Sequence, residues 1–321
     1  MDNRNQMIDL IKFIFSICII AIHVSLFKDI SSMSYYTLTM GIFRLAVPFF
    51  FVVSGYFYYK KIREERSIKN NILKIIKVFF IVELIEILIY TPILVGQKDF
   101  SILLYLWKIF STGLGTIYWY VTSFVISLII LIPFWKKRKI GFMFIIGLIL
   151  YLIAMTNDSY GLLFVGTHIQ KLAIFHTQIW TYPQAGLCSS VLFLSIGAYI
   201  EEKRIDIKNV FIPILIFIVL LLGESYYLQS HQAFDANCYF TLIFLAPLLL
   251  IWCLQYSKKM FDTRIFGQMS FYVYMIHPIV LNIIRFIFPF FSSLLLFLVI
   301  SVLTLFISYI IVKKQYIKNK V

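Results

Sequence analysis

Charged side chains are scarce in this sequence. Asp, Glu, Lys and Arg make up 14% of the 321 residues, whereas hydrophobic residues make up 61%, and the mean hydropathy is +0.90. Soluble domains contain roughly 45–50% apolar residues. A chain with this excess needs lipid as its solvent, so the composition excludes an ordinary soluble protein.

Cysteine is also rare, with only four residues: Cys18, Cys188, Cys238 and Cys253. None of them forms a CxxC pair, and most lie in apolar runs. This pattern excludes a disulfide framework and a cysteine metal site. We expect the thiols to behave as small buried hydrophobic side chains.

Motifs of soluble enzymes are missing as well. The sequence has no P-loop, no HExxH zinc motif, no hydrolase elbow and no Rossmann glycine fingerprint. Nothing between the apolar runs reads as a soluble domain. Any chemistry is therefore expected within the membrane or at its faces, and ATP-driven pumping would need a separate ATPase subunit.

The apolar residues fall into ten runs, each long enough to cross about 30 Å of hydrocarbon as a helix. They lie at 8–27, 38–59, 72–95, 117–135, 140–156, 184–200, 209–228, 238–257, 270–289 and 291–312. A shorter run at 100–113 is expected to be re-entrant or interfacial, and 158–183 to form a long outer loop. No small-residue cleavage site follows the first run, so we expect a retained helix. The fold class predicted is an all-α integral membrane protein, a single polytopic domain over 1–321 with about ten transmembrane helices.

The basic residues predict the orientation of these spans. With the N-terminus inside, the cytoplasmic segments carry 20 Lys and Arg and the outer segments carry 4. The cytoplasmic segments are the N-terminus, 60–71, 136–139, 201–208, 258–269 and the C-terminal tail. The split follows the positive-inside rule and predicts cytoplasmic termini in a bacterial inner membrane. It also explains the net charge of +14 without a nucleic-acid partner.

Ionisable side chains inside the predicted spans are costly in lipid and mark candidate sites. Lys12 and His23 are separated by about three helical turns, so they share one face ~16 Å apart along the axis. A cation near the inner end can bind an anion, and an imidazole can act as a general base. The alternative is that Lys12 reaches the inner headgroups and His23 caps the outer interface.

The second run carries Arg44 near its outer end, followed by Pro48, Ser54 and Gly55. Arg44 needs a partner or a wet cavity. Pro48 removes a backbone hydrogen bond and can open a polar niche. Ser54 and Gly55 are small enough to allow close helix contact.

Two carboxylates, Glu83 and Glu86, lie three residues apart near the middle of the third run. At this depth they require cationic partners or a polar cavity. They are candidates for catalysis or for binding substrate. The alternative is an ion-pair network with Arg44 or Arg285 that only ties helices together.

The ninth run opens on a polar stripe at helical spacing. Ser270, Tyr274 and His277 recur on one face, and Pro278 follows. Pro278 is expected to free a backbone carbonyl of the helix.

Three of these patterns resemble motifs of the membrane acyltransferase family 3. Lys12-x10-His23 is similar to a basic-x10-His motif in which the basic residue is more often Arg. The run at 47–56 resembles the second-helix signature, and 270–278 resembles a late Ser…Tyr-x-x-His-Pro element. Their order and spacing extend the resemblance over essentially the whole chain.

The resemblance implies transfer of an acyl group, often acetyl, from cytoplasmic acyl-CoA to a cell-envelope carbohydrate or small-molecule hydroxyl. His23 would be the base that deprotonates the acceptor, and Glu83 is a second catalytic candidate. The residues expected to bind donor or acceptor are Lys12, Arg44, Ser54, Glu86, Ser270, Tyr274 and His277. Acyl-CoA would be a co-substrate, with no permanently bound cofactor or metal.

Two departures from the family pattern matter. Lys12 in place of Arg lacks the two-pronged phosphate contact. Some members carry an extracytoplasmic hydrolase-like domain, which this sequence lacks, so it would act alone or with a separate extracytoplasmic partner.

A second branch of the same family is also similar: the membrane domain of vancomycin-resistance serine racemases, which is thought to take up serine. The segment 223–225 followed by 238–257 resembles that branch. On this alternative the chain is an amino-acid transporter. Arg44, Glu83 and Glu86 would then bind the carboxylate and amine of the substrate.

Overall fold

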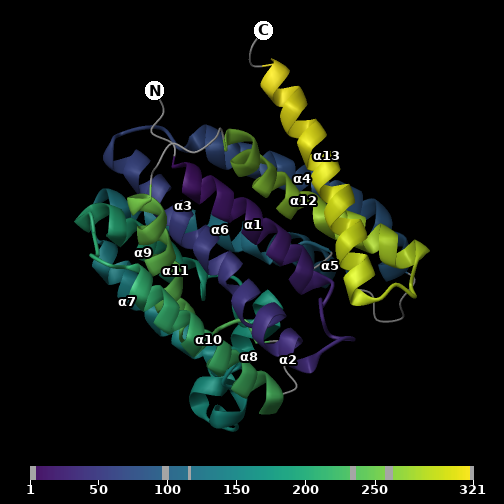
Figure 1. The fold of residues 1–321 in the computed structure, drawn as a ribbon, viewed down its shortest axis with the longest axis horizontal. Helices are drawn as coiled ribbons and strands as arrows, with labels where there is room; N and C mark the ends of the chain where they lie inside the picture. The colour runs from purple at the N-terminus through teal and green to yellow at the C-terminus, as the bar shows by residue number, and fades with distance from the viewer. Residues whose placement is uncertain (1–4, 96–100, 115–116, 232–235, 257–262, 319–321) are drawn as a thin grey trace. The chain divides into compact units, whose positions relative to one another are not determined.

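The computed structural model describes residues 5–95, 101–114, 117–231, 236–256 and 263–318 (Figure 1). Over these residues the chain forms helices and turns and contains no strand. The chain divides into two compact units. The first comprises Met1–Ala46, Asp206–Ser230 and Phe244–Val321, and the second comprises Val47–Ile205 and His231–Ile243.

Each of the ten predicted spans coincides with a helix. These helices are α1 (Gln6–His23), α3 (Ala46–Arg63), α4 (Lys69–Val95), α6 (Trp119–Lys136), α7 (Ile140–Met155), α9 (Ser190–Lys203), α10 (Phe211–His231), α11 (Leu242–Gln255), α12 (Arg264–Ile287) and α13 (Ser293–Lys318). The predicted helical class is confirmed. Parts of the predicted cytoplasmic segments, at 1–4, 258–262 and 319–321, lie outside the described residues.

Six helical segments among the described residues are long and apolar enough to cross a membrane. They are Gln6–His23, Ser32–Arg63, Trp119–Lys136, Phe211–His231, Arg264–Ile287 and Ser293–Ile317. Three further apolar helices, Ile102–Ser111, α7 and α11, are shorter. Helix α4 carries lysines and two glutamates along its length. These segments support a multi-pass membrane protein. The count of ten spans and the cytoplasmic termini stay predictions.

The first unit is built around α1, α12 and α13. Helix α12 packs against both α1 and α13, and α13 appears in yellow beside α12 in Figure 1. Phe13 and Phe266 meet edge to face, with ring centroids 4.9 Å apart, in the contact between α1 and α12. The Asn5 side chain accepts a hydrogen bond from the Ile8 N–H at 3.0 Å and caps α1. This bond satisfies one of the backbone N–H groups that have no helical acceptor at the start of α1.

Two hydrogen bonds tie the segment that follows α1 to the start of α13. The Asp29 carboxylate accepts hydrogen bonds from the hydroxyl and the backbone N–H of Ser293, the N–H at 2.9 Å. Ser293 is the first residue of α13, where backbone N–H groups lack helical partners. These two bonds lower the pKa of Asp29 below its usual value.

The second predicted span is not one regular helix. A short helix α2 (Ser32–Ser34), a π-helix η1 (Tyr35–Thr39) and a 3₁₀-helix η2 (Ile42–Leu45) precede α3. The break falls at Gly41, where any side chain would clash with Ser225 of α10. Pro48 lies within the first turn of α3, where a missing N–H costs little. The irregularity therefore precedes Pro48.

The second unit is held together by glycines on α3, α7 and α9. A side chain on Gly55 would clash with the Leu194 carbonyl of α9, and a side chain on Gly197 would clash with the Val52 carbonyl of α3. On α7, a Cβ at Gly147 would lie 2.5 Å from the Leu192 nitrogen. These helices touch backbone to backbone, as predicted for Gly55.

The predicted outer loop 158–183 contains structure of its own. It includes a 3₁₀-helix η3 (Gly161–Phe164) and a helix α8 (His168–Trp180). The Thr167 hydroxyl accepts a hydrogen bond from the Gln170 N–H at 3.2 Å and caps α8. Thr167 is thus a helix start signal within the segment predicted as a loop. Burial lowers the pKa of His176, whose Nε2 lies 3.4 Å from the Cys188 sulfur. The short run at 100–113 is likewise a helix, α5 (Ile102–Ser111).

Candidate functional site

The predicted site residues fall into two groups, one in each unit. The first unit holds Lys12, His23, Arg44, Ser270, Tyr274 and His277, and the second holds Ser54, Glu83 and Glu86.

A stacked pair of imidazoles lies in the first unit. His23 ends α1 and His277 lies within α12, and their ring centroids are 5.3 Å apart with an interplanar angle of 28°. The packing of α1 against α12 brings together residues that are far apart in the sequence. Each histidine was a separate candidate in the sequence, and the contact between them is a finding of the structure.

The hydrogen bonding of His277 defines its tautomer. Its side chain is 0% exposed, and Nδ1 lies 3.1 Å from the Val273 carbonyl oxygen. A carbonyl can only accept, so Nδ1 carries the proton and Nε2 presents a lone pair. Nε2 has no hydrogen-bond partner among the described residues. A buried acceptor in this state points to a donor supplied from outside, such as a substrate hydroxyl or water.

Two guanidinium groups flank this imidazole pair. Arg285 donates to the backbone carbonyl of His23 at 2.9 Å, which satisfies an acceptor at the C-terminal end of α1. Arg44 lies on η2, with a nitrogen 3.3 Å from the Met40 sulfur. Both arginines interact electrostatically with His23. The cluster therefore includes two guanidinium groups, which can stabilise an anionic ligand or a developing oxyanion.

Ser270, Tyr274 and His277 form the polar stripe of α12 and are all buried, but each has a different partner. The Tyr274 ring lies 5.8 Å from the His277 ring, so it borders the imidazole pair. Ser270 donates to the Gly267 carbonyl at 3.0 Å and is bonded back to its own helix. Pro278 has no N–H, and this leaves the Tyr274 carbonyl without its helical donor. Helix α12 continues through Pro278 to Ile287.

Lys12 lies on the same continuous helix as His23 and is half-buried. The helical rise separates the two positions by about 16 Å along α1. Lys12 and the imidazole pair would therefore contact different parts of a long ligand.

The carboxylates form the second group. Glu83 is 1% exposed, and its Oε1 accepts a hydrogen bond from the Leu114 N–H at 2.9 Å. Its Oε2 has no hydrogen-bond partner among the described residues. Glu86 is fully buried one turn later on α4, and the two carboxylates interact electrostatically. No ion pair to Glu83 is present within the described part of this unit.

Hydroxyl groups lie on the segment that contacts Glu83. Thr122 donates to the Ser111 carbonyl at 2.5 Å, and the Ser111 hydroxyl itself is buried with no partner among the described residues. Gly113, two residues on, adopts a left-handed φ of 76°, and a Cβ there would lie 2.8 Å from Glu83 Oε2. Sequence reasoning missed this segment, although Ser-Thr-Gly at the end of a short apolar run is a signal for it.

Ser54 does not join the carboxylates. It hydrogen bonds with the Tyr120 side chain, whose ring lies 4.6 Å from that of Phe51.

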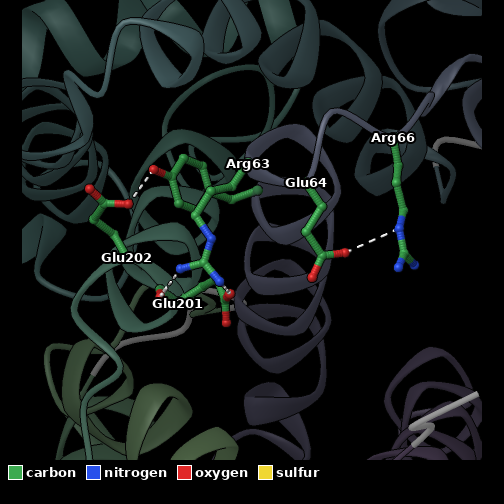
Figure 2. A network of polar contacts seen from close by, with 6 residues as sticks. Arg63, Glu64, Arg66, Glu201 and Glu202 are labelled. Carbon is green, nitrogen blue, oxygen red and sulfur yellow. Dashed lines mark hydrogen bonds and ion pairs between the residues drawn. The ribbon is translucent and has the colours of Figure 1, made fainter.

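A polar network on α3 and α9 was also missed. Arg63 forms an ion pair with Glu201 at 2.5 Å, and the Tyr59 hydroxyl donates to Glu202 at 2.5 Å (Figure 2). In the sequence analysis Arg63 counted only as a basic residue of the cytoplasmic segment 60–71, and Tyr59, Glu201 and Glu202 were not singled out. The close packing of α3 on α9 brings them together.

Comparison with known proteins places the chain among acyltransferase-like sequences. A family described as "Acyltransferase domain" matches residues 5–313. An amino-acid racemase from Enterococcus faecalis is 27% identical over 298 residues, which cover 89% of this chain and 42% of the relative. A serine/alanine racemase from Enterococcus gallinarum is 27% identical over 291 residues, covering 86% and 40%.

A further Enterococcus faecalis amino-acid racemase is 30% identical over 257 residues, covering 77% of this chain and 35% of the relative. The chain thus spans less than half the length of these curated relatives. No solved structure shows significant similarity to it.

Proposed function

The chain belongs to the acyltransferase-domain family that matches its residues 5–313, and on this basis we propose that it transfers an acyl group in the membrane. The proposed donor is cytoplasmic acyl-CoA, acetyl-CoA first, and the acceptor is a hydroxyl of a cell-envelope carbohydrate or small molecule. The proposed location is the bacterial inner membrane. The stacked pair of His23 and His277, with a free lone pair on His277, is the observation that carries the proposal.

In the proposed reaction, His23 accepts the proton of the acceptor hydroxyl as its oxygen attacks the thioester carbonyl. The carbon–sulfur bond breaks, the acyl group forms an ester with the acceptor, and the proton leaves on the CoA thiol. Arg44 and Arg285 stabilise negative charge that develops on the carbonyl oxygen. His277 accepts a hydrogen bond through Nε2 and orients either the His23 ring or the acceptor.

The remaining candidates have proposed binding roles. Lys12, about 16 Å along α1, would hold a donor phosphate. Tyr274 and Ser270 would line the path beside His277. In the second unit, Glu83 and Glu86 would form a polar site of their own that accepts hydrogen bonds from hydroxyl groups, with Glu83 as an acid–base candidate.

The experiment is a CoA-release assay on the purified chain in nanodiscs, with labelled acetyl-CoA. His23→Ala should lower release by about 10²- to 10⁴-fold, the usual contribution of a general base. The matched control is His168→Ala, because His168 is exposed on α8. Equal release by the two variants would refute the role of His23.

A second candidate function is amino-acid transport. It is favoured by the buried carboxylate of Glu83, which has no ion pair to the described residues of its unit. The ammonium group of an amino acid could supply such a partner. The similarity to proteins named as serine/alanine and amino-acid racemases is compatible with it. Proteoliposomes would then accumulate labelled serine without acyl-CoA, and Glu83→Gln would abolish uptake. Absence of uptake across a panel of amino acids would remove this candidate.

A further inference from the structure

The second unit contains a cavity of about 870 Å³, and none of the residues given a role in acyl transfer lines it. It lies where the turn between α3 and α4 meets the C-terminal end of α6. Its volume is within the range of small-molecule sites. Five basic residues line it, Arg63, Arg66, Lys69, Lys136 and Arg138, against one acidic residue, Glu65.

Two of these cations already have partners. Figure 2 shows Arg63 directed toward Glu201, with an N–O distance of 2.5 Å, so its charge is neutralised inside the protein. Arg66 pairs with Glu64 at 3.2 Å, but its side chain is 69% exposed. Such a surface pair is weak. Arg66 can therefore exchange Glu64 for a ligand anion.

The other three cations have no carboxylate partner among the described residues. They are Lys69, Lys136 and Arg138. Lys69 is also the first residue of the 27-residue helix α4, whose N-terminal N–H groups add positive potential at the same place. The cavity therefore retains positive charge after its internal pairs are counted.

The floor of the cavity is aromatic and apolar. Trp135 is 1% exposed and lies edge to face against Tyr59, with ring centroids 5.9 Å apart. Its indole N–H is buried and has no acceptor among the described residues. A buried N–H donor without a protein acceptor can donate to water or to a ligand group. Ile62 and Ile132 complete the apolar side.

An apolar path leaves the cavity along α4. Leu73 lines the cavity and is 49% exposed. Phe80, Leu84 and Leu88 follow on an exposed face of α4, with the exposed Lys77 between Leu73 and Phe80. An alkyl chain attached to a group in the cavity would follow this face. The ligand that fits both parts has an anionic head and an apolar tail.

We propose that this cavity binds the phosphate group of an amphiphile whose alkyl chain runs along α4. Phosphate suits the ammonium, guanidinium and N–H donors described above. Two sources share this chemistry: the headgroup of an anionic phospholipid, and the nucleotide phosphates of a long-chain acyl-CoA. The lipid case is independent of acyl transfer, whereas the acyl-CoA case rests on the proposed function.

The test compares two double variants of the same basic turn. Lys136→Gln with Arg138→Gln removes two cations of the cavity. Lys137→Gln with Lys139→Gln removes the same charge from residues outside the lining. Binding to the purified full chain is measured with fluorescent phosphatidylglycerol, with phosphatidylcholine carrying the same label, and with radiolabelled palmitoyl-CoA.

The cavity variant should bind its ligand about tenfold more weakly, equivalent to about 1.4 kcal/mol, because it loses two solvent-screened charge contacts. The control variant should change less than about twofold. Trp135→Phe keeps an aromatic ring but removes the indole N–H, so it should also weaken binding. The melting temperature of each variant checks that it folds.

A selective loss of phosphatidylglycerol binding identifies a lipid site, and a selective loss of palmitoyl-CoA binding identifies a donor site. Equal binding by both double variants, or no binding of either anionic probe to the wild type, overturns the proposal. His23→Ala separates the failure of the cavity proposal from the failure of the acyl-transfer proposal. It should strongly lower CoA release while leaving binding to this cavity unchanged.

Discussion

Replacing His277 by phenylalanine tests the imidazole pair directly. Phe keeps an aromatic ring against His23 but removes both ring nitrogens. Loss of the bond to the Val273 carbonyl costs about 0.5–1.5 kcal/mol, whereas removal of a buried Nε2 without a described partner relieves about 1–3 kcal/mol. The free energy of unfolding should therefore stay the same or rise by up to about 2 kcal/mol.

The rate of acyl transfer should fall, even though the free energy of unfolding does not. His277→Phe is expected to lower CoA release by about 10²-fold or more, because it removes a polar group proposed to orient the base or the acceptor. The assay is CoA release in nanodiscs, with the melting temperature of the same samples. The control is His168→Phe on the exposed side of α8, which should change neither quantity. A strongly destabilised His277→Phe protein with full turnover would refute the reasoning.

Three other substitutions address the packing and the carboxylates. Gly197→Val should lower the melting temperature, at a cost of about 1–3 kcal/mol, whereas Gly141→Val, which faces open space, should not. Because hydrogen bonds from Ser293 lower the pKa of Asp29, this group stabilises the fold above an unfolded pKa of about 3.9 and loses that contribution as the pH falls through the folded value. Asp29→Asn should therefore flatten the fall of melting temperature with acid. Glu83→Gln retains an acceptor for its backbone donor and should stay folded while losing acylation or uptake.

Each of these has a contradictory outcome. Equal melting temperatures of the two glycine variants would show that α3 and α9 are not in backbone contact. An unchanged acid profile in Asp29→Asn would mean that the hydrogen bonds to the start of α13 contribute nothing. Full activity of Glu83→Gln would leave that carboxylate with a structural role.

The helices were predictable from the sequence because the bilayer allows few alternatives. A long apolar run must satisfy its backbone internally, so each of the ten runs meets a helix. Hydropathy says nothing of backbone geometry, and the break at Gly41 was therefore missed. The helix α8 was missed because its composition resembles that of a loop with aromatic residues.

The sequence identified single residues of the candidate site but not the contacts between them. Periodicity identifies the face of a helix but not the neighbour of that face, so the contact between His23 and His277 lay beyond it. Glu83 was identified as a buried carboxylate, but its donor, the Leu114 N–H, is 31 residues away. The basic residues of 60–71 and 136–139 were read as markers of orientation, whereas five of them surround one cavity.

The glycine contacts of α9 have a mechanical consequence for the second unit. Backbone atoms that touch through Gly55, Gly147 and Gly197 leave no side-chain layer in which one helix can slide past another. We expect α3, α7 and α9 to move as a single rigid body. Helix α4, which carries Glu83 and one wall of the basic cavity, has no described glycine contact of this kind. A conformational step in this unit should therefore involve helices outside that rigid body, and α4 is one of them.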